Sequence, residues 1–392
     1  MSTHANRVQM TVSGTPGTGT ITLNAASSGY RSFATAYGGN ATVDILVTEG
    51  TSWEVARDCT YTNSGTTVTR GTLESSSTGS AVSFTSAAIV SVIPTAHWGN
   101  RAEGALQSVT PGGRLTLESG VPISTTDQTA KTTIYYTPYV HNIINLWDGA
   151  NWVPTTFAET SEALGTLTSG LAYDVFGFLS AGALDLEKLA WTSGTARATA
   201  VTLQDGRYCK SGDKTRLYLG TFYTTSTTTT EDSAGGTTTQ VGGKRFLWNA
   251  YNRVSRPISV IDTTDSWSYA TDTVRQANAA SGNKVEMVVG LSTEAVSANV
   301  GTMLYCLNNS ARAAKVGIGV DSTTAFSGLR QGGYNTSFNG CYFAMSASYV
   351  GFPGIGYHYL AWLEKGSDGT SAFLGDNAAD GQQSGMIAEV WA

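Results

Sequence analysis

Residues 8–39 decide the fold class, and they read VQMTVSGTPGTGTITLNAASSGYRSFATAYGG. The continuation over 42–62 is TVDILVTEGTSWEVARDCTYT. Apolar and polar side chains alternate here in short segments, as at Val8, Met10 and Val12, and Gly, Ser, Thr and Asn separate the segments. A period of two indicates half-buried β-strands. The closely spaced strands predict an N-terminal β-domain over 1–96, of the sandwich or small-barrel kind, and we expect a sandwich.

The same pattern continues through most of the 392 residues, a length that favours two or three domains. We expect a linker over 97–113 with one helical turn near 102–106, a middle β-domain over 114–232 and a C-terminal β-domain over 244–392. Asp148-Gly149 and Asp205-Gly206 predict hairpin turns. Glu159 with Glu162 suggests a short helix. The Thr-rich segment 224–243 suggests a mobile loop or a long hairpin tip. The predicted fold is all-β, with a β-sandwich followed by further antiparallel sandwich or jelly-roll-like domains.

Composition limits the function classes. Charged residues make up 13% of the chain, where about 25% is usual. Net charge is −6 and the basic residues are dispersed, so we expect no nucleic-acid binding. The sequence contains no run of about 18 apolar residues, so we expect no membrane-spanning segment. The N-terminal MSTHANRVQM lacks the apolar core of a signal peptide, so we expect synthesis in the cytoplasm.

Candidate catalytic and metal-binding residues lack the spacing that their chemistry needs. Four histidines are widely separated, and His358, between two tyrosines, is expected to be structural. Gly317-Ile318-Gly319 is expected to serve packing. We considered three carboxylate pairs for glycoside hydrolysis and one acidic group for calcium, and expect turn-capping or structural roles for them. They are Asp262 with Asp265, Glu231 with Asp232, Asp174 with Asp185, and Asp368, Asp376 and Asp380.

The four cysteines match neither a zinc site nor a disulfide framework. We expect free buried thiols, and Cys306 with Cys341 is the one pair that merits inspection. We expect no catalytic residue, no metal and no cofactor. Nine Trp and 18 Tyr are compatible with a sugar-binding surface, although core and interface roles are the simpler interpretation. Trp147 and Trp152 should pack across their hairpin.

Several longer blocks resemble structural proteins of tailed bacteriophages and prophages. In the N-terminal region these are GYRSF at 29–33, GTSWEV at 50–55 and TRGTLESSS at 69–77. Further blocks are TTIYYTPY at 132–139, 190–220, KRFLWNAYNRVSR at 244–256, 263–280 and YHYLAWLE at 357–364. The likeness covers most of the chain in blocks. The segment AGGTTTQVGG at 234–243 departs from the family pattern and puts only a loop length in doubt.

The resemblance implies a non-enzymatic virion protein, first of all a tail fibre or tail-associated protein. The resemblance also implies a homo-oligomer, usually a trimer in such proteins. Its N-terminal module would dock to other virion proteins such as a tail hub, adaptor or capsid. The β-domains would face the host surface, where glycans are candidate ligands. The alternatives are a head decoration or head fibre protein, and a glycan-depolymerising tail spike. The spike is disfavoured because no repeat predicts a β-helix. The receptor-binding residues stay unknown.

Overall fold

A computed structural model describes residues 3–96, 110–236, 240–306, 312–329, 331–335, 341–367, 371–376 and 383–392. The fold is all-β, as predicted from the alternating sequence. The chain forms two compact units, Met1–Ser108 and Val109–Ala392. The expected linker falls largely outside the described residues, including the helical turn near 102–106 and His97. No helix in the described part is long and apolar enough to cross a membrane.

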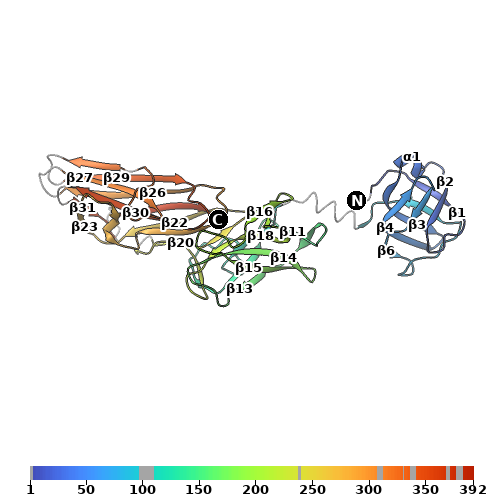
Figure 1. Ribbon diagram of the computed structural model, residues 1–392, viewed down its shortest axis with the longest axis horizontal. Coiled ribbons are helices and arrows are strands. Elements are labelled where there is room, and N and C mark those ends of the chain that lie inside the picture. The colour runs from blue at the N-terminus through green and yellow to red at the C-terminus, as the bar shows by residue number, and fades with distance from the viewer. Residues whose placement is uncertain are drawn as a thin grey trace. The chain divides into compact units, whose positions relative to one another are not determined.

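Within residues 3–96, six strands close into a barrel (Figure 1). The order is β3-β7-β1-β2-β5-β4, and the β3–β4 pairing closes it, with β6 added beside β4. The expected sandwich is therefore a closed barrel, because β3 pairs with both β4 and β7. The strands are β1 (Gln9–Ser13), β2 (Ile21–Ala26), β3 (Ala41–Glu49), β4 (Ser52–Thr62), β5 (Thr67–Thr69), β6 (Thr72–Ser76) and β7 (Ile89–Val92).

One short helix plugs this barrel. Helix α1 (Phe33–Tyr37) starts at Ser32, whose Oγ accepts a hydrogen bond from the Thr35 N–H at 3.0 Å. It ends at Gly38, whose φ of +66° suits glycine. Phe33 is fully buried, and its ring centroid lies 5.2 Å from that of Tyr61. The block GYRSF thus supplies the turn, cap and core plug of this element.

The second unit begins with small antiparallel sheets. Its first strands are β8 (Gly113–Thr116), β9 (Gln128–Lys131), β10 (Thr133–Pro138), β11 (Ile143–Trp147), β12 (Trp152–Thr156), β13 (Thr160–Ala163), β14 (Ala172–Ser180), β15 (Ala183–Ala190), β16 (Val201–Gln204), β17 (Arg207–Lys210) and β18 (Asp213–Tyr223). Trp147 lies opposite Trp152 around the Asp148-Gly149 turn, as predicted. The expected helix at Glu159 and Glu162 is wrong, because 160–163 pairs with β10 as strand β13.

The remaining strands form two sheets packed over one core, except β21, which pairs with β18 of the sheet β15-β14-β18-β17-β16. They are β19 (Thr230–Ser233), β20 (Lys244–Arg245), β21 (Leu247–Asn249), β22 (Ser255–Asp262), β23 (Ser266–Tyr269), β24 (Arg275–Gln276), β25 (Lys284–Val289), β26 (Val296–Cys306), β27 (Arg312–Val320), β28 (Gln331–Asn335), β29 (Cys341–Gly351), β30 (Gly356–Ser367), β31 (Ser371–Leu374) and β32 (Ser384–Trp391), with a 3-10 turn, η1, at Ala277–Ala279. One sheet runs β28-β27-β30-β25-β20-β19-β9, and the other runs β22-β32-β26-β31-β23 with β29 beside β26.

The middle and C-terminal segments share a sheet and one buried cluster, while a second buried cluster lies in the middle segment and includes only Leu247 from beyond it. Strand β9 joins the first of these sheets through β19, and one buried cluster includes Phe176 as well as Val285 and Val390. Segments 114–232 and 244–392 lie in one compact unit, Val109–Ala392. Part of the Thr-rich segment is strand, and Thr230 is completely buried.

Candidate functional site

The candidate site is the solvent-facing side of four adjacent strands, β22, β32, β26 and β29 (Figure 1). Alternate residues of these strands enter the core, for example Val260, Met386, Val300 and Ala347. The others point outward, because side chains alternate across a strand. We call this set the outer face. It consists of Ser255, Pro257, Ser259 and Ile261; Gly385, Ile387, Glu389 and Trp391; Ser297, Asn299, Gly301, Met303 and Tyr305; and Tyr342, Ala344, Ser346, Ser348 and Val350.

A groove of about 620 Å³ crosses the outer face. The pairing register places Pro257, Glu389, Ser297 and Val350 in one row across the four strands. The next row is Ser259, Ile387, Asn299 and Ser348. Both rows line the groove, so its walls combine apolar side chains with hydroxyl and amide groups.

The relief of the outer face comes from two glycines and two projecting apolar side chains. Gly301 lies directly opposite Gly385, and a Cβ at Gly301 would meet nothing within 4 Å, so the backbone is bare at that position. Ile387 and Val350 are 66% and 73% exposed. At one end, the rings of Tyr305 and Tyr342 pack with centroids 4.8 Å apart. This combination of bare backbone and raised apolar groups gives the face a shape that a partner surface can fill.

Charge is almost absent from the outer face. Glu389 is its single charged side chain, and it accepts a hydrogen bond from Ser255 Oγ at 2.5 Å. The outward side of the opposite sheet differs, since Lys284, Glu286, Lys315 and Lys365 lie there. Lys284 contacts Glu286, and Lys365 Nζ lies 2.9 Å from an Asp272 oxygen. The charged residues of a charge-poor chain are thus kept away from the outer face.

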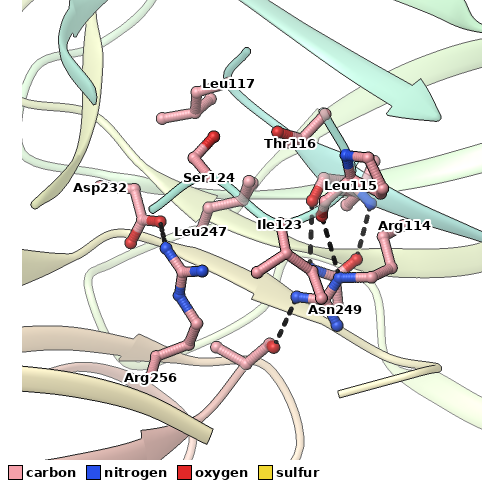
Figure 2. Close-up of a pocket in the computed structure, with 12 residues that line it drawn as sticks. Arg114, Leu115, Thr116, Leu117, Ile123, Ser124, Asp232, Leu247, Asn249 and Arg256 are labelled. Carbon is pink, nitrogen blue, oxygen red and sulfur yellow. Dashed lines mark hydrogen bonds and ion pairs between the residues drawn. The ribbon is translucent and has the colours of Figure 1, made fainter. Parts of the chain in front are cut away.

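A second, smaller pocket of about 20 Å³ is lined in part by β8 (Figure 2). Buried Arg114 donates to the carbonyl oxygens of Pro122, Asn252 and Ala392. Nearby, Asp232 accepts hydrogen bonds from Arg256 at 2.8 Å and Arg245 at 3.2 Å. Burial, with repulsion from Arg256 second, lowers the pKa of Arg114 to about 10. The cavity holds no more than a water-sized molecule, so we assign this cluster to fastening segments far apart in sequence.

The carboxylates considered for hydrolysis do not form catalytic pairs among the described residues. Asp262 is completely buried and accepts hydrogen bonds from Gln240, Asn278 and Asn283. The main-chain oxygen of Asp265 accepts a hydrogen bond from the Gly375 N–H. Both carboxylate oxygens of Asp262 are therefore occupied by hydrogen bonds within the protein, which fits a structural role.

The other two pairs separate in the same way. Glu231 contacts Lys244, whereas Asp232 contacts Arg245 and Arg256. Asp174 is held by Arg197 at 2.7 Å and by the Thr221 hydroxyl, also at 2.7 Å. Asp185 lies opposite Phe178 and accepts from the Leu186 N–H.

His358 is buried, and its Nδ1 lies 2.7 Å from Asp321 Oδ2, which fits a structural histidine. His141 Nδ1 accepts from the Ile143 N–H at 3.2 Å, and His4 lies 3.3 Å from Asp44. Gly317 is closed in by the Phe326 ring, which a Cβ would meet at 2.1 Å. The packing interpretation of Gly317-Ile318-Gly319 agrees with this contact.

Metal ligands and thiols give no further site in the described part of the chain. No group of three or more His, Cys, Asp or Glu could hold a metal ion there. Asp368 and Asp380 of the acidic group lie outside the described residues. Cys59 and Cys209 are free and buried, as expected. The backbone register places Cys306 directly opposite Cys341 across β26 and β29.

Trp147 and Trp152 pack edge to face across their hairpin, with centroids 5.5 Å apart, as predicted. Lys214 Nζ lies 4.7 Å from the Trp147 ring, and the Arg207 guanidinium lies 4.5 Å from the Trp152 ring. Trp152 Nε1 donates to Asp205 at 3.1 Å. These contacts explain the two tryptophans by packing and cation–π attraction.

Sequence reasoning did not identify the groove. Its one sequence signal is the outward series Gly385, Ile387, Glu389 and Trp391, which places large apolar side chains where polar ones are usual. Which strands adjoin this series depends on long-range pairing, which the local pattern does not contain.

No protein-family model matches the chain, and no curated protein sequence matches it. Among solved structures, the mosquito-larvicidal Cry4Aa toxin of Bacillus thuringiensis is similar over 69% of this chain and 50% of its own, at 10% identity and a TM-score of 0.18. The delta-endotoxin Cry8Ea1 of the same organism is similar over 72% of this chain and 52% of its own, at 6% identity and a TM-score of 0.18. The chain thus spans about half the length of these toxins. A structure of the infectious bursal disease virus Gx strain is similar over 99% of this chain and 77% of its own, at 9% identity and a TM-score of 0.19. Likenesses this weak carry no argument about function.

Proposed function

We propose that the protein is a non-enzymatic structural component of a tailed-bacteriophage particle, most simply a tail fibre or tail-associated protein. The sequence blocks at 29–33, 50–55, 69–77, 132–139 and 244–256 support this proposal by their resemblance to such proteins. The observation from the structure that favours a contact role is the outer face, a broad grooved sheet surface with one charge.

The proposed roles follow the two units. The barrel unit docks to other virion proteins, and the larger unit presents β-sheet surfaces to the host surface, where glycans are candidate ligands. The protein acts as a homo-oligomer in the virion, a trimer by family resemblance. A contact role needs no titrating group, which agrees with the engaged state of Asp174, Asp232 and Asp262.

Immunogold electron microscopy of purified virions, with an antibody against this chain, tests the proposal. Labelling of the tail, with a copy number that is a small multiple of the tail symmetry, is the expected result. Labelling of the head at a copy number near that of the capsid shell would instead identify a decoration protein. Absence of the chain from virions would refute the virion proposal altogether.

The non-enzymatic part has its own test. Purified protein is incubated with host polysaccharide, and reducing ends are measured. We expect no release above that of heat-denatured protein. Release by the native protein would favour the depolymerase spike.

A further inference from the structure

The outer face of the larger unit has a feature that solvent contact alone does not explain. A sheet face that stays in water normally carries polar and charged side chains. Here Ile387, Val350 and Trp391 are 66%, 73% and 43% exposed, and Glu389 is the only charge. Apolar exposure combined with loss of charge is the composition of the centre of a protein interface.

We propose that the outer face is buried against a second copy of this chain. The first argument is electrostatic. Two identical surfaces that meet bring like charges together, which disfavours self-association of a charged face. A face with one carboxylate, already hydrogen-bonded to Ser255, avoids nearly all of this repulsion. The opposite sheet, with Lys284, Lys315 and Lys365, would not avoid it.

The second argument is size. Strands β22, β32, β26 and β29 contain 8, 8, 11 and 11 residues. With about 3.3 Å per residue and about 4.8 Å between strands, they cover roughly 600 Å² before side-chain relief is added. Stable interfaces bury about 600–1,000 Å² on each partner. The outer face alone is therefore large enough for a specific homo-oligomer.

The third argument is shape. Ile387 lies in the row next to the bare backbone of Gly301, and Val350 projects one row further along, so the same surface offers both projections and a recess. Self-association needs both on one surface, because the same patch occurs on each partner in a twofold contact. A twofold contact pairs two copies, whereas the family resemblance implies three, so this inference shares with the proposed function only the expectation of a homo-oligomer.

Sedimentation of the full-length chain across the micromolar range tests the proposal, with two charge-adding variants. Ile387→Asp places a carboxylate in the groove, and Asn299→Asp adds one beside it with almost no change in volume. The matched control is Leu203→Asp, an apolar residue of β16 that is 61% exposed and lies outside the outer face. Circular dichroism and thermal melting check that every variant is folded.

We expect a wild-type oligomer that persists in high salt, at least a tenfold weaker association for both outer-face variants, and no change for Leu203→Asp. A monomeric wild type would overturn the inference and leave the face to a ligand or a different protein. An oligomer that all three variants retain would also overturn it, since another surface would then hold the copies together. Neither result affects the virion labelling experiment, so the two proposals can fail separately.

Discussion

At the scale of single residues, Asp174 shows how this protein accommodates buried charge. Its side chain is 1% exposed, and burial raises the pKa of the carboxyl, while Arg197 and Thr221 oppose that rise. Arg197 also donates to Tyr218 Oη and to the Gly290 carbonyl, and its guanidinium lies 4.5 Å from the Trp191 ring. A buried ion pair of this kind specifies one packing arrangement more than it adds stability.

Removing only the cation should therefore be costly. Arg197→Met retains an apolar stem against Trp191 but leaves Asp174 without its charge partner, and we expect a loss of about 3–5 kcal/mol in the free energy of unfolding. The control, Arg216→Met, breaks a pair with Glu187 in which both side chains are roughly a quarter exposed, and should cost less than about 1 kcal/mol. Urea titration measures both losses. Equal losses in the two variants would contradict this account.

The two described thiols should be inert in the native protein. Cys59 and Cys209 are fully buried, and burial raises the pKa of each to about 11. Because the thiolate is the reactive form, we expect neither to be alkylated by iodoacetamide at pH 8. Peptide mapping by mass spectrometry is the measurement, and the chain unfolded in guanidinium, where both should react, is the control. Native labelling of Cys59 would mean that the barrel opens readily.

Glu159 gives a prediction about pH. Burial disfavours its charge, but hydrogen bonds from Ser119, Thr137 and the Gly120 N–H outweigh this, so its pKa lies below the usual 4.5. A depressed carboxyl pKa stabilises the fold above the unfolded-state value, and this stability is lost as pH falls through the folded value. Wild type should melt higher than Glu159→Gln at pH 7, and the gap should shrink below about pH 4.5. A gap that stays constant down to pH 3 would refute this assignment.

At the scale of elements, close pairing of strands depends on particular small residues. In β18, Gly220 lies opposite Asn249 of β21. A Cβ at Gly220 would come within 2.1 Å of the Trp248 carbonyl oxygen and 2.8 Å of Leu115 Cδ1. The Asn249 side chain also accepts from the Leu115 N–H at 2.7 Å, so β8, β18 and β21 are fastened at one point.

Gly220→Ala should separate these strands. We expect a destabilisation of at least about 1–3 kcal/mol, because the obstacle is backbone that cannot rotate away. Gly194→Ala is the control, since its Cβ would meet only the Cβ of Tyr357, at 3.9 Å, and should change stability by less than about 0.5 kcal/mol. Both values come from denaturant unfolding followed by tryptophan fluorescence. A tolerated Gly220→Ala would show that β21 can shift away from β18.

At the scale of the whole molecule, the chain consists of two units with separate cores. The barrel core contains Ile45, and the core of the larger unit contains Ile318; both side chains are completely buried. Cores that are not shared should unfold as separate cooperative transitions.

Differential scanning calorimetry of the full chain should therefore show two transitions. Ile45→Ala should lower only one of them and Ile318→Ala only the other, each by about 2–5 kcal/mol of stability in its own unit. A single transition that both variants lower equally would instead show strong coupling between the units.

Local sequence patterns were enough to predict the all-β class, the turns at Asp148-Gly149 and Asp205-Gly206, and the burial of Cys59 and Cys209. These features depend on local alternation and on turn residues, which need only neighbouring positions. Asp205 and Gly206 both have positive φ, as such a turn requires. The structural role of His358 could also be predicted, because no second histidine lies at metal-ligand spacing from it in the sequence.

Barrel closure, the pairing of β9 with β19 and the strand at 160–163 could not be predicted from local patterns, because each depends on strand pairing in the folded chain. The same holds for the candidate site. Ile387, Asn299 and Ser348 come from three separated segments, and only their pairing register places them in one row. Long-range pairing is chosen by the free energy of the whole core rather than by any local pattern. The groove and the scarcity of charged side chains on the outer face can therefore be recognised only once the neighbouring strands are known.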